Sequence, residues 1–307
     1  MSPRISLIGY GEAGHAIAAG LREQGVTDIT AWDILFPEVA GAKLAEGAKA
    51  IGVTVAPSAG DAVRDTDLVI AAVTAASSLE AAQSVAAHLK GQPFYLDVNS
   101  VSPGRKQATA QLLGNVARYV DVAIVAAIYP ARHKSPMMLA GPYGKAVEPL
   151  LVSLGMSTQI VGDEIGAAAA IKMVRSVMIK GIEALTLECF LAATRAGVVD
   201  QVAESLKNNY PTLDWNKLCE YNIERMASHG IRRAAEMRES AQTLRELGID
   251  PLMTAGTIER QQQLGEIGRL PQVKETVAKG RDGMLAAISA ATGKISKSKR
   301  RPYSASS

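Results

Sequence analysis

The stretch that decides the fold is residues 5–14, ISLIGYGEAG. Three of its first four residues are apolar and two are β-branched isoleucines, which predicts a buried strand, and the alanine-rich stretch that follows residue 14 predicts a helix. Gly9 permits a tight turn, Gly11 allows a pyrophosphate to approach the backbone, and Gly14 lets the helix pack on the strand. Free N–H groups at a helix start attract anions. We therefore expect a dinucleotide-binding turn here.

Short strand-like runs continue through the N-terminal half and alternate with alanine-rich helical stretches. Strands that alternate with helices in this way predict βαβ units in a parallel sheet. The predicted strands are residues 5–8, 28–31, 53–56, 68–73, 94–98, 119–126, 137–140 and 158–161.

After Gly162 the strand pattern stops, and helical patterns fill the rest of the chain. A proline-free run from 165 to 195 predicts one long helix, too long for a crossover within a sheet, which leads from one domain into the next. Further helices are predicted at 201–208, 214–229, 230–247, 252–264 and 273–291. The predicted fold is an α/β Rossmann-type nucleotide-binding domain over 1–162 and an all-α substrate and dimerisation domain over 163–293. We expect a disordered basic tail over 294–307.

Charge and composition exclude several classes of protein. Lys and Arg total 33 against 30 acids, but five of the basic residues lie in the tail, so the body of the chain is near neutral. Aromatic residues are only 4% of the chain, which leaves little for stacking on nucleic-acid bases. No apolar run approaches the roughly 20 residues of a membrane span. We expect neither a nucleic-acid partner nor a membrane partner.

Cysteine and histidine are too few and too scattered for a disulfide framework or a metal site. Two cysteines, Cys189 and Cys219, and four histidines show no paired ligand spacing. Both cysteines fall in predicted helices, where we expect small buried side chains. A reducing, cytoplasmic setting fits this composition.

An acidic residue at the end of the second predicted strand indicates the cofactor. Asp33 lies 19 residues beyond Gly14, where a carboxylate would accept a hydrogen bond from a ribose 2′-hydroxyl. No cation follows until Lys43, so a 2′-phosphate has no evident partner. We expect NAD, with NADP left open. The predicted cofactor-binding residues are Gly9, Tyr10, Gly11, Glu12, Ala13, Gly14, Asp33, Val73, Thr74 and Asn99.

Three further segments resemble a known superfamily. Residues 97–103, DVNSVSP, resemble a motif of the β-hydroxyacid dehydrogenases and 6-phosphogluconate dehydrogenases, and residues 121–127, DVAIVAA, stand where those enzymes carry a substrate loop. Residues 166–176 resemble the start of their long interdomain helix. Segments 172–176, 180–184 and 232–237 resemble the branch whose C-terminal domain is of unknown function, the DUF1932 type.

The resemblance implies a nicotinamide-dependent alcohol dehydrogenase, usually a homodimer, that acts on a small molecule. Hydride transfer from an alcohol needs a group that accepts the hydroxyl proton. Family analogy and its apolar neighbours both favour Lys172 as this general acid/base, although an ordinary surface lysine is the alternative. Arg175, three residues on, would pair with a substrate carboxylate or make an interdomain ion pair.

The expected substrate contacts depart from the family in two places. Ser176 stands where better-known branches have an amide, and Val125 and Ala126 replace a hydroxyl-bearing loop, which predicts a more apolar pocket for a bulkier alcohol. Lys180 and Glu183 are expected to form a surface helix pair. The predicted substrate-binding residues are Ser100, Val125, Ala126, Tyr129, Arg175, Ser176 and Arg233, the last with a helix pair to Glu236 as its alternative.

Two other functions are compatible with these features. Related folds reduce C=N bonds, so an imine reductase is the first alternative, although a cationic acid suits an oxyanion better than an iminium. The second is a protein that senses NAD without turnover, which the altered substrate loop allows and the lysine-bearing helix disfavours.

Overall fold

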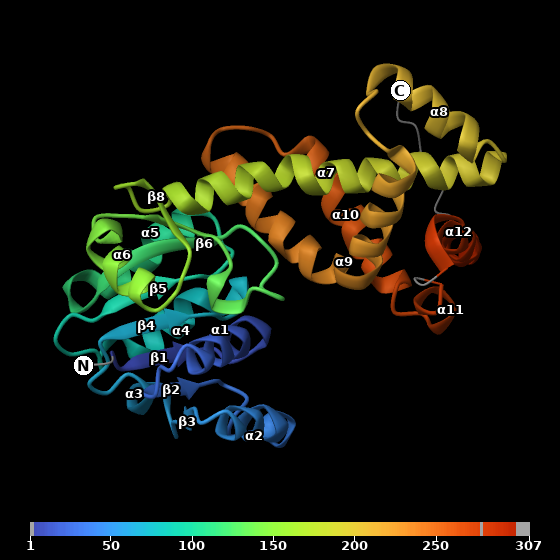
Figure 1. The fold of residues 1–307 in the computed structure, drawn as a ribbon. Coiled ribbons are helices and arrows are strands. Elements are labelled where there is room, and N and C mark those ends of the chain that lie inside the picture. Colours follow the sequence, from blue (N-terminus) through green and yellow to red (C-terminus); the bar gives the residue numbers. More distant parts are fainter. Residues whose placement is uncertain (1–2, 277–278, 299–307) are drawn as a thin grey trace. The chain divides into compact units, whose positions relative to one another are not determined.

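The computed structural model describes residues 3–276 and 279–298, which fall into two compact units (Figure 1). Unit 1 contains the described residues up to Val174 together with Gln242–Gly248. Unit 2 contains Arg175–Ala241 and the described residues from Ile249 onward. The boundary predicted near Gly162 coincides with the end of the last strand, twelve residues before the units divide.

Unit 1 is built on one sheet, eight-stranded within the described residues, whose order is β3-β2-β1-β4-β5-β6-β7-β8. The order reverses between β1 and β4, and ligands bind at such a reversal in open α/β sheets. The strands are β1 (Ile5–Ile8), β2 (Ile29–Trp32), β3 (Thr54–Val55), β4 (Leu68–Ala71), β5 (Phe94–Asp97), β6 (Arg118–Ile124), β7 (Met137–Ala140) and β8 (Thr158–Gly162).

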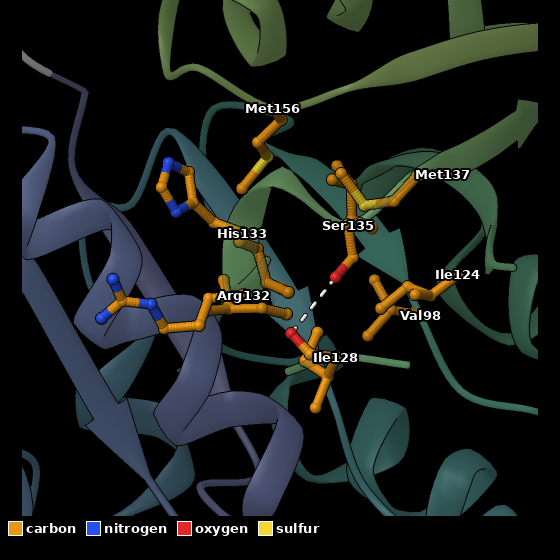
Figure 2. Close-up of a pocket in the computed structure, with 11 residues that line it drawn as sticks. Val98, Ile124, Ile128, Arg132, His133, Ser135, Met137 and Met156 are labelled. Carbon is orange, nitrogen blue, oxygen red and sulfur yellow. Dashed lines mark hydrogen bonds between the residues drawn. The ribbon is translucent and has the colours of Figure 1, made fainter. Parts of the chain in front are cut away.

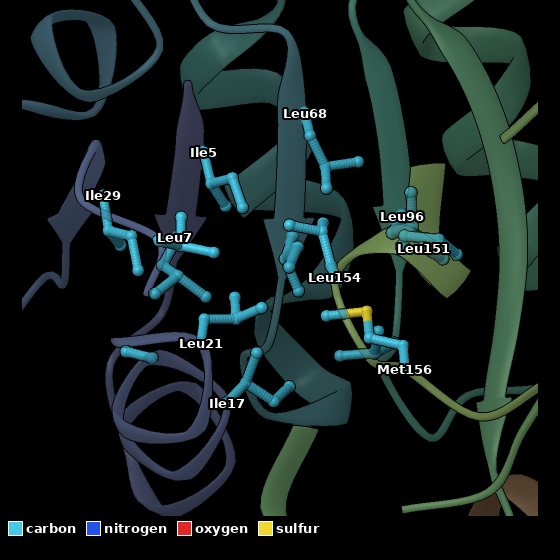
Figure 3. Packing of buried hydrophobic residues seen from close by; sticks show 14 of the residues in the cluster. Ile5, Leu7, Ile17, Leu21, Ile29, Leu68, Leu96, Leu151, Leu154 and Met156 are labelled. Carbon is cyan, nitrogen blue, oxygen red and sulfur yellow. The ribbon is translucent and has the colours of Figure 1, made fainter. Parts of the chain in front are cut away.

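Helices cover both faces of this sheet, which explains why its central strands are buried and mostly apolar. On one face Ile5 and Leu7 of β1 pack with Ile17 and Leu21 of α1 (Glu12–Glu23) (Figure 3). That core also includes residues of α2 (Ala42–Ala50) and α6 (Gly144–Ser153). The other face packs on α3 (Ala59–Ala62), α4 (Ser78–Ala86) and α5 (Pro103–Leu113).

Two strands, β7 and β8, depart from the predicted parallel pattern. β6 and β7 are antiparallel, with Val122 opposite Leu139, whereas β7 and β8 are parallel. A loop connects β6 to β7. Such a loop is enough for antiparallel neighbours, whereas parallel neighbours need a crossover connection, usually a helix.

Unit 2 is helical throughout its described residues, and α7 (Ala167–Ala196) begins in unit 1 and ends in unit 2. The core of unit 2 contains Phe190, Ile223 and Ile288. None of the helices in the described part of the chain is both long and apolar enough to cross a membrane. The other helices are α8 (Val199–Asn209), α9 (Trp215–Glu246), α10 (Leu252–Ile267), α11 (Pro271–Lys274) and α12 (Gly280–Ser298).

Three helical predictions need correction. The two helices predicted to meet at Gly230 are one continuous helix, α9, because this glycine serves packing: a β-carbon on it would lie 2.3 Å from the carbonyl oxygen of Gln261 in α10. The helix predicted at 273–291 is interrupted between α11 and α12. Helix α12 runs to Ser298, so the predicted disordered tail is wrong over 294–298, and residues 299–307 lie outside the described residues.

Candidate active site

The turn between β1 and α1 is tight because two glycines leave no room for a side chain. Gly9 has φ +93°, and a β-carbon on it would lie 2.4 Å from the carbonyl oxygen of Ala72 at the end of β4. A β-carbon on Gly14 would lie 2.2 Å from the carbonyl oxygen of Gly9. The first and third glycines of the motif therefore press the turn against β4 and against its own helix.

The second glycine of the motif faces open space. Nothing lies within 4 Å of the position that a β-carbon on Gly11 would occupy, and Gly11 is the N-cap of α1 with no side-chain hydrogen bond. Helix α1 begins at Glu12, followed by Ala13, so the backbone N–H groups of its first turn border that space. A pyrophosphate fits there, because it needs both the room and the donors.

Asp33 lies beside this turn, and its carboxylate holds the turn through hydrogen bonds to backbone N–H groups. Its Oδ2 accepts a hydrogen bond from the Tyr10 N–H at 2.7 Å, and its Oδ1 accepts one from the Leu35 N–H at 2.9 Å. A carboxylate has about four lone-pair positions, so two remain for ribose hydroxyls. Asp33 therefore fits the ribose role predicted for it while also holding the loop.

Tyr10 contributes backbone rather than side chain to this region. Its ring is fully buried, in edge contact with His15 and tilted against Phe36. Burial raises the pKa of Tyr10 to about 12. The predicted cofactor contact of Tyr10 is thus limited to its main chain, because the side chain belongs to the core of unit 1.

The end of β4 connects the glycine turn to the loop after β5. The Val73 N–H donates a 2.7 Å hydrogen bond to Oδ1 of Asn99, and the Asn99 N–H donates to Oδ1 of Asp97 at 3.0 Å. The buried Nδ2 of Asn99 has no hydrogen-bond partner within the described residues. Thr74 is exposed at the same edge. Asn99 thus reaches the strand end that Gly9 touches.

Lys172 and Ser100 meet in unit 1, 72 residues apart in sequence. The ammonium Nζ of Lys172 donates a 2.7 Å hydrogen bond to Oγ of Ser100, and both residues are half-buried. Ser100 directly follows Asn99, so the lysine lies on the loop that is bonded to the end of β4. The structure thereby brings together the predicted general acid/base and a predicted substrate contact.

A buried charge cluster beneath this loop was not predicted. Asp97 and Asp121 are partners in the register of β5 and β6, and Lys106 of α5 places Nζ 3.1 Å from Oδ1 of Asp97 and 3.4 Å from Oδ1 of Asp121. The Tyr119 hydroxyl donates to Oδ2 of Asp97 at 2.8 Å, and burial is the main reason why the pKa of Tyr119 is raised. Acids within otherwise apolar strand runs were the available sequence signal, since a buried carboxylate needs a partner.

The loop between β6 and β7, which we predicted to contact the substrate, exposes apolar side chains. Val125 is half-buried, Ala126 is exposed, and Tyr129 is 46% exposed. Inside the loop the Ser135 hydroxyl bonds to the carbonyl oxygen of Ile128 (Figure 2). The enclosed cavity there measures about 10 Å³, room for roughly one water. It is therefore no substrate site.

The residues predicted in unit 2 are mostly engaged with one another. Arg233 is buried and paired with Glu183, so its alternative pairing with Glu236 is wrong, and its occupied guanidinium disfavours the predicted substrate role. Lys180 and Glu183 are buried rather than a surface pair, and Lys180 lies 3.0 Å from Glu236. Desolvation lowers the pKa of Lys180, partly offset by Glu236.

Ser176 and Arg175 differ in exposure, as adjacent helical positions often do. Oγ of Ser176 is buried and accepts a 3.2 Å hydrogen bond from Lys180, whereas Arg175 is exposed.

Of the two cysteines, Cys219 is buried as predicted, but Cys189 is exposed. No group of metal-ligating side chains occurs within residues 3–276 and 279–298.

Two family models match the chain, one in its N-terminal part and one in its C-terminal part. Residues 4–100 match the family described as NADP oxidoreductase coenzyme F420-dependent. Residues 193–264 match the domain of unknown function DUF1932. The second match is the type of C-terminal domain that the sequence resembled.

Relatives match the chain over nearly its whole length. A conserved hypothetical protein from Sinorhizobium meliloti 1021 is 32% identical, with 94% of this chain and 97% of that chain covered and a TM-score of 0.76. A second conserved protein of unknown function, described as structurally similar to 3-hydroxyacid dehydrogenases, is 29% identical over 86% of this chain and 97% of its own, with a TM-score of 0.70. The chain belongs to the β-hydroxyacid dehydrogenase-like superfamily, in the branch with a DUF1932 domain.

Other similar proteins are more distant. An uncharacterised 28.5 kDa protein of Methanothermus fervidus is 27% identical over 250 residues, 81% of this chain and 94% of its own. The 3-hydroxyisobutyrate dehydrogenase of Mycobacterium tuberculosis, 17% identical with a TM-score of 0.71 and 95% and 99% coverage, shares the fold. An imine reductase from Myxococcus stipitatus, 19% identical with a TM-score of 0.58 and 93% and 99% coverage, does so too.

The buried ring of His133 should make the stability of unit 1 depend on pH. Its ring is buried against α1, where a β-carbon on Gly20 would lie 2.0 Å from Nδ1, and neither ring nitrogen has a hydrogen-bond partner among the described residues. Desolvation, followed by Lys134 and Arg132, lowers the pKa of His133 below its ordinary value of 6.5.

Replacing His133 by phenylalanine should reduce acid destabilisation. Below pH 6.5 the unfolded chain takes up a proton on His133 before the folded chain does, so this residue costs up to about 1.4 kcal/mol per pH unit until the folded pKa is reached. Urea unfolding at pH 7.5 and pH 5.0 measures the difference. In the control variant His88→Gln, which changes an exposed histidine, the free energy of unfolding should fall between pH 7.5 and pH 5.0 as much as in the wild type. An equal fall in His133→Phe would show that His133 is not the source of the acid destabilisation.

Proposed function

We propose that this protein is an NAD(P)-dependent dehydrogenase that transfers a hydride between a hydroxyl-bearing substrate and the nicotinamide. The hydrogen bond from Lys172 to Ser100 is the observation that carries the proposal. It lies on the loop that is bonded, through Asn99 and Val73, to the strand end beside the glycine turn. A proton-transferring group and a dinucleotide turn at one edge of a sheet are the two parts that alcohol oxidation needs.

A nicotinamide cofactor held at the turn of Gly9, Gly11 and Gly14 would supply the hydride acceptor for alcohol oxidation, or the hydride donor for the reverse reaction. The chain itself handles the proton: in the neutral form, Lys172 accepts the hydroxyl proton at Nζ as the C=O bond forms, and in the reverse direction the ammonium gives it back. Ser100 orients Lys172, because its Oγ accepts one of the lysine hydrogens. Because Oγ of Ser100 uses one lone pair to accept this hydrogen bond, its own hydroxyl hydrogen is available to point toward the substrate oxygen.

The substrate class follows from the side chains that remain available. We propose a hydroxy acid or a bulkier apolar or aromatic hydroxy compound, because Val125 and Ala126 offer apolar surface without a hydroxyl and Tyr129 adds an exposed aromatic ring. Exposed Arg175 remains a candidate partner for a carboxylate. Ser176 stays in the proposal as a polar contact, whereas Arg233 leaves it. A homodimer and a cytoplasmic location stay predictions.

The preferred cofactor is proposed to be NAD, because the Asp33 carboxylate would repel a 2′-phosphate. Asp33→Asn should lower the ratio of the Kd for NADP to the Kd for NAD by about tenfold or more. The substitution removes the negative charge that would repel a 2′-phosphate, while the amide oxygen can still accept a backbone N–H. Titration of both cofactors measures the ratio. The exposed neighbour Glu38→Gln serves as control, and an unchanged ratio in Asp33→Asn would refute the preference.

Cofactor reduction by wild-type protein across a library of hydroxy acids, aryl alcohols and alkyl alcohols tests the proposal. Turnover that is fastest with aryl or alkyl hydroxy compounds supports the apolar pocket, and a preference for small polyhydroxy acids would overturn that part. NADPH- or NADH-dependent reduction of cyclic imines without alcohol turnover would instead identify an imine reductase. Tight NAD binding without turnover of any compound would identify a sensor.

A further inference from the structure

Two aspartates stand side by side inside the sheet of unit 1. Asp97 of β5 and Asp121 of β6 are partners in the parallel register, and both side chains are fully buried. Like charges on paired strands destabilise a sheet unless a cation lies between them. The cation is Lys106, whose side chain is 1% exposed and whose Nζ also donates to the carbonyl oxygens of Asp97 and Val122.

Each aspartate holds a different piece of the proposed active site. Oδ1 of Asp97 accepts the Asn99 N–H and so fixes the loop that continues into Ser100. Oδ2 of Asp121 accepts the N–H groups of Gly166 and Ala169, both at 3.1 Å, and so fixes the start of α7. Lys172 lies less than one turn beyond Ala169 on that helix. Lys106 therefore ties the loop of Ser100 to the helix of Lys172.

A purely stabilising role explains this arrangement poorly. Buried ion clusters lose much of their Coulombic gain to desolvation, and apolar residues of similar volume often replace them without loss of stability. Oδ1 of Asp121 has the Lys106 ammonium at 3.4 Å and no hydrogen bond within the described residues. Attraction to that ammonium is therefore the polar interaction that this oxygen makes within the described residues.

We propose that Lys106 is a positioning residue: by holding Asp97 and Asp121 together, it sets the distance at which Lys172 meets Ser100. The kinetic part of this inference rests on the proposed function. The geometric part does not, because it concerns the contact between Lys172 and Ser100 whether or not a substrate turns over. The two parts are therefore measured separately.

The test compares Lys106→Met with the double variant Lys106→Met/Asp121→Asn. Methionine removes the cation and leaves two buried carboxylates together, so the melting temperature should fall. The added amide halves the excess charge and can still accept the two N–H groups of α7, so the double variant should regain most of the melting temperature. It also keeps the test possible if the single variant does not fold.

The readouts are kcat, KM, NAD affinity and acetylation of Lys172 by dilute acetic anhydride, followed by mass spectrometry. We expect both variants to lose about tenfold or more in kcat, with KM and the Kd for NAD within about twofold, because positioning acts on the transition state. Acetylation of Lys172 should rise about threefold in both, because the amine no longer faces Ser100. The exposed Lys49→Met variant on α2 controls for the loss of a lysine.

Recovery of kcat together with melting temperature in the double variant would overturn the proposal, since Lys106 would then serve stability alone. Unchanged acetylation of Lys172 in both variants would overturn it as well. If wild-type protein shows no turnover with any substrate, the proposed function fails, and the acetylation rates still decide the positioning role.

Discussion

Lys172→Met should lower kcat by about 10²- to 10⁴-fold, the usual contribution of a general acid or base. Methionine preserves the length and the apolar part of the side chain but has no proton to exchange. The Kd for NAD should stay within about twofold, because the glycine turn and Asp33 are untouched. Stopped-flow measurement of cofactor reduction separates the chemical step from product release, and fluorescence titration gives the Kd.

Two further variants make the Lys172 result specific. Lys145→Met removes an exposed lysine of the same unit, whose surface ion pair with Asp163 is solvent-screened, and it should keep wild-type kcat. Lys172→Ala should regain activity when small primary amines are added, since they can fill the vacated volume and carry the proton. A kcat within threefold of wild type in Lys172→Met would show that another group exchanges the proton.

The second large effect separates two glycines of one motif. Gly11→Val should leave the free energy of unfolding within about 0.5 kcal/mol of wild type, because Gly11 has φ −64° and its β-carbon position is open. The Kd for NAD should rise at least tenfold, because the side chain takes the space of the pyrophosphate.

Gly14→Ala should behave in the opposite way with respect to stability. Its β-carbon would lie 2.2 Å from the carbonyl oxygen of Gly9, so the turn must shift, at a cost of about 1–3 kcal/mol in the free energy of unfolding. Urea unfolding and NAD titration of both variants give the comparison. A Gly11→Val variant that unfolds easily, or that binds NAD normally, would contradict the assigned geometry.

Much of unit 1 could be predicted because its signals are local. Residues 5–14 contain the strand, the turn and the helix start in consecutive positions, and the structure has β1 and α1 there. The direction of β7 could not be predicted, since a four-residue apolar strand looks the same in either orientation. The meeting of Lys172 with Ser100 was foreseen only as two separate residues near one substrate.

Ion pairs were the weakest part of the prediction, because sequence spacing tests only neighbours on one helix. Arg233 was weighed against Glu236, three residues away, yet its partner is Glu183, 50 residues earlier. Lys106 gave no local signal, because its two carboxylates come from separate strands. Such pairs become visible only when the topology places one element against another.

The short segment Gln242–Gly248 limits how this protein can be divided. It belongs to unit 1, although it follows the first part of unit 2 in the chain. Its Glu246 accepts hydrogen bonds from the Ser102 hydroxyl at 2.8 Å and from the Gly104 N–H at 3.0 Å, at the start of α5. A fragment that ends at Val174 would lack both of these hydrogen bonds, because unit 1 is not one contiguous piece of the chain. An isolated version of unit 1 would therefore need residues 242–248 attached through a designed linker.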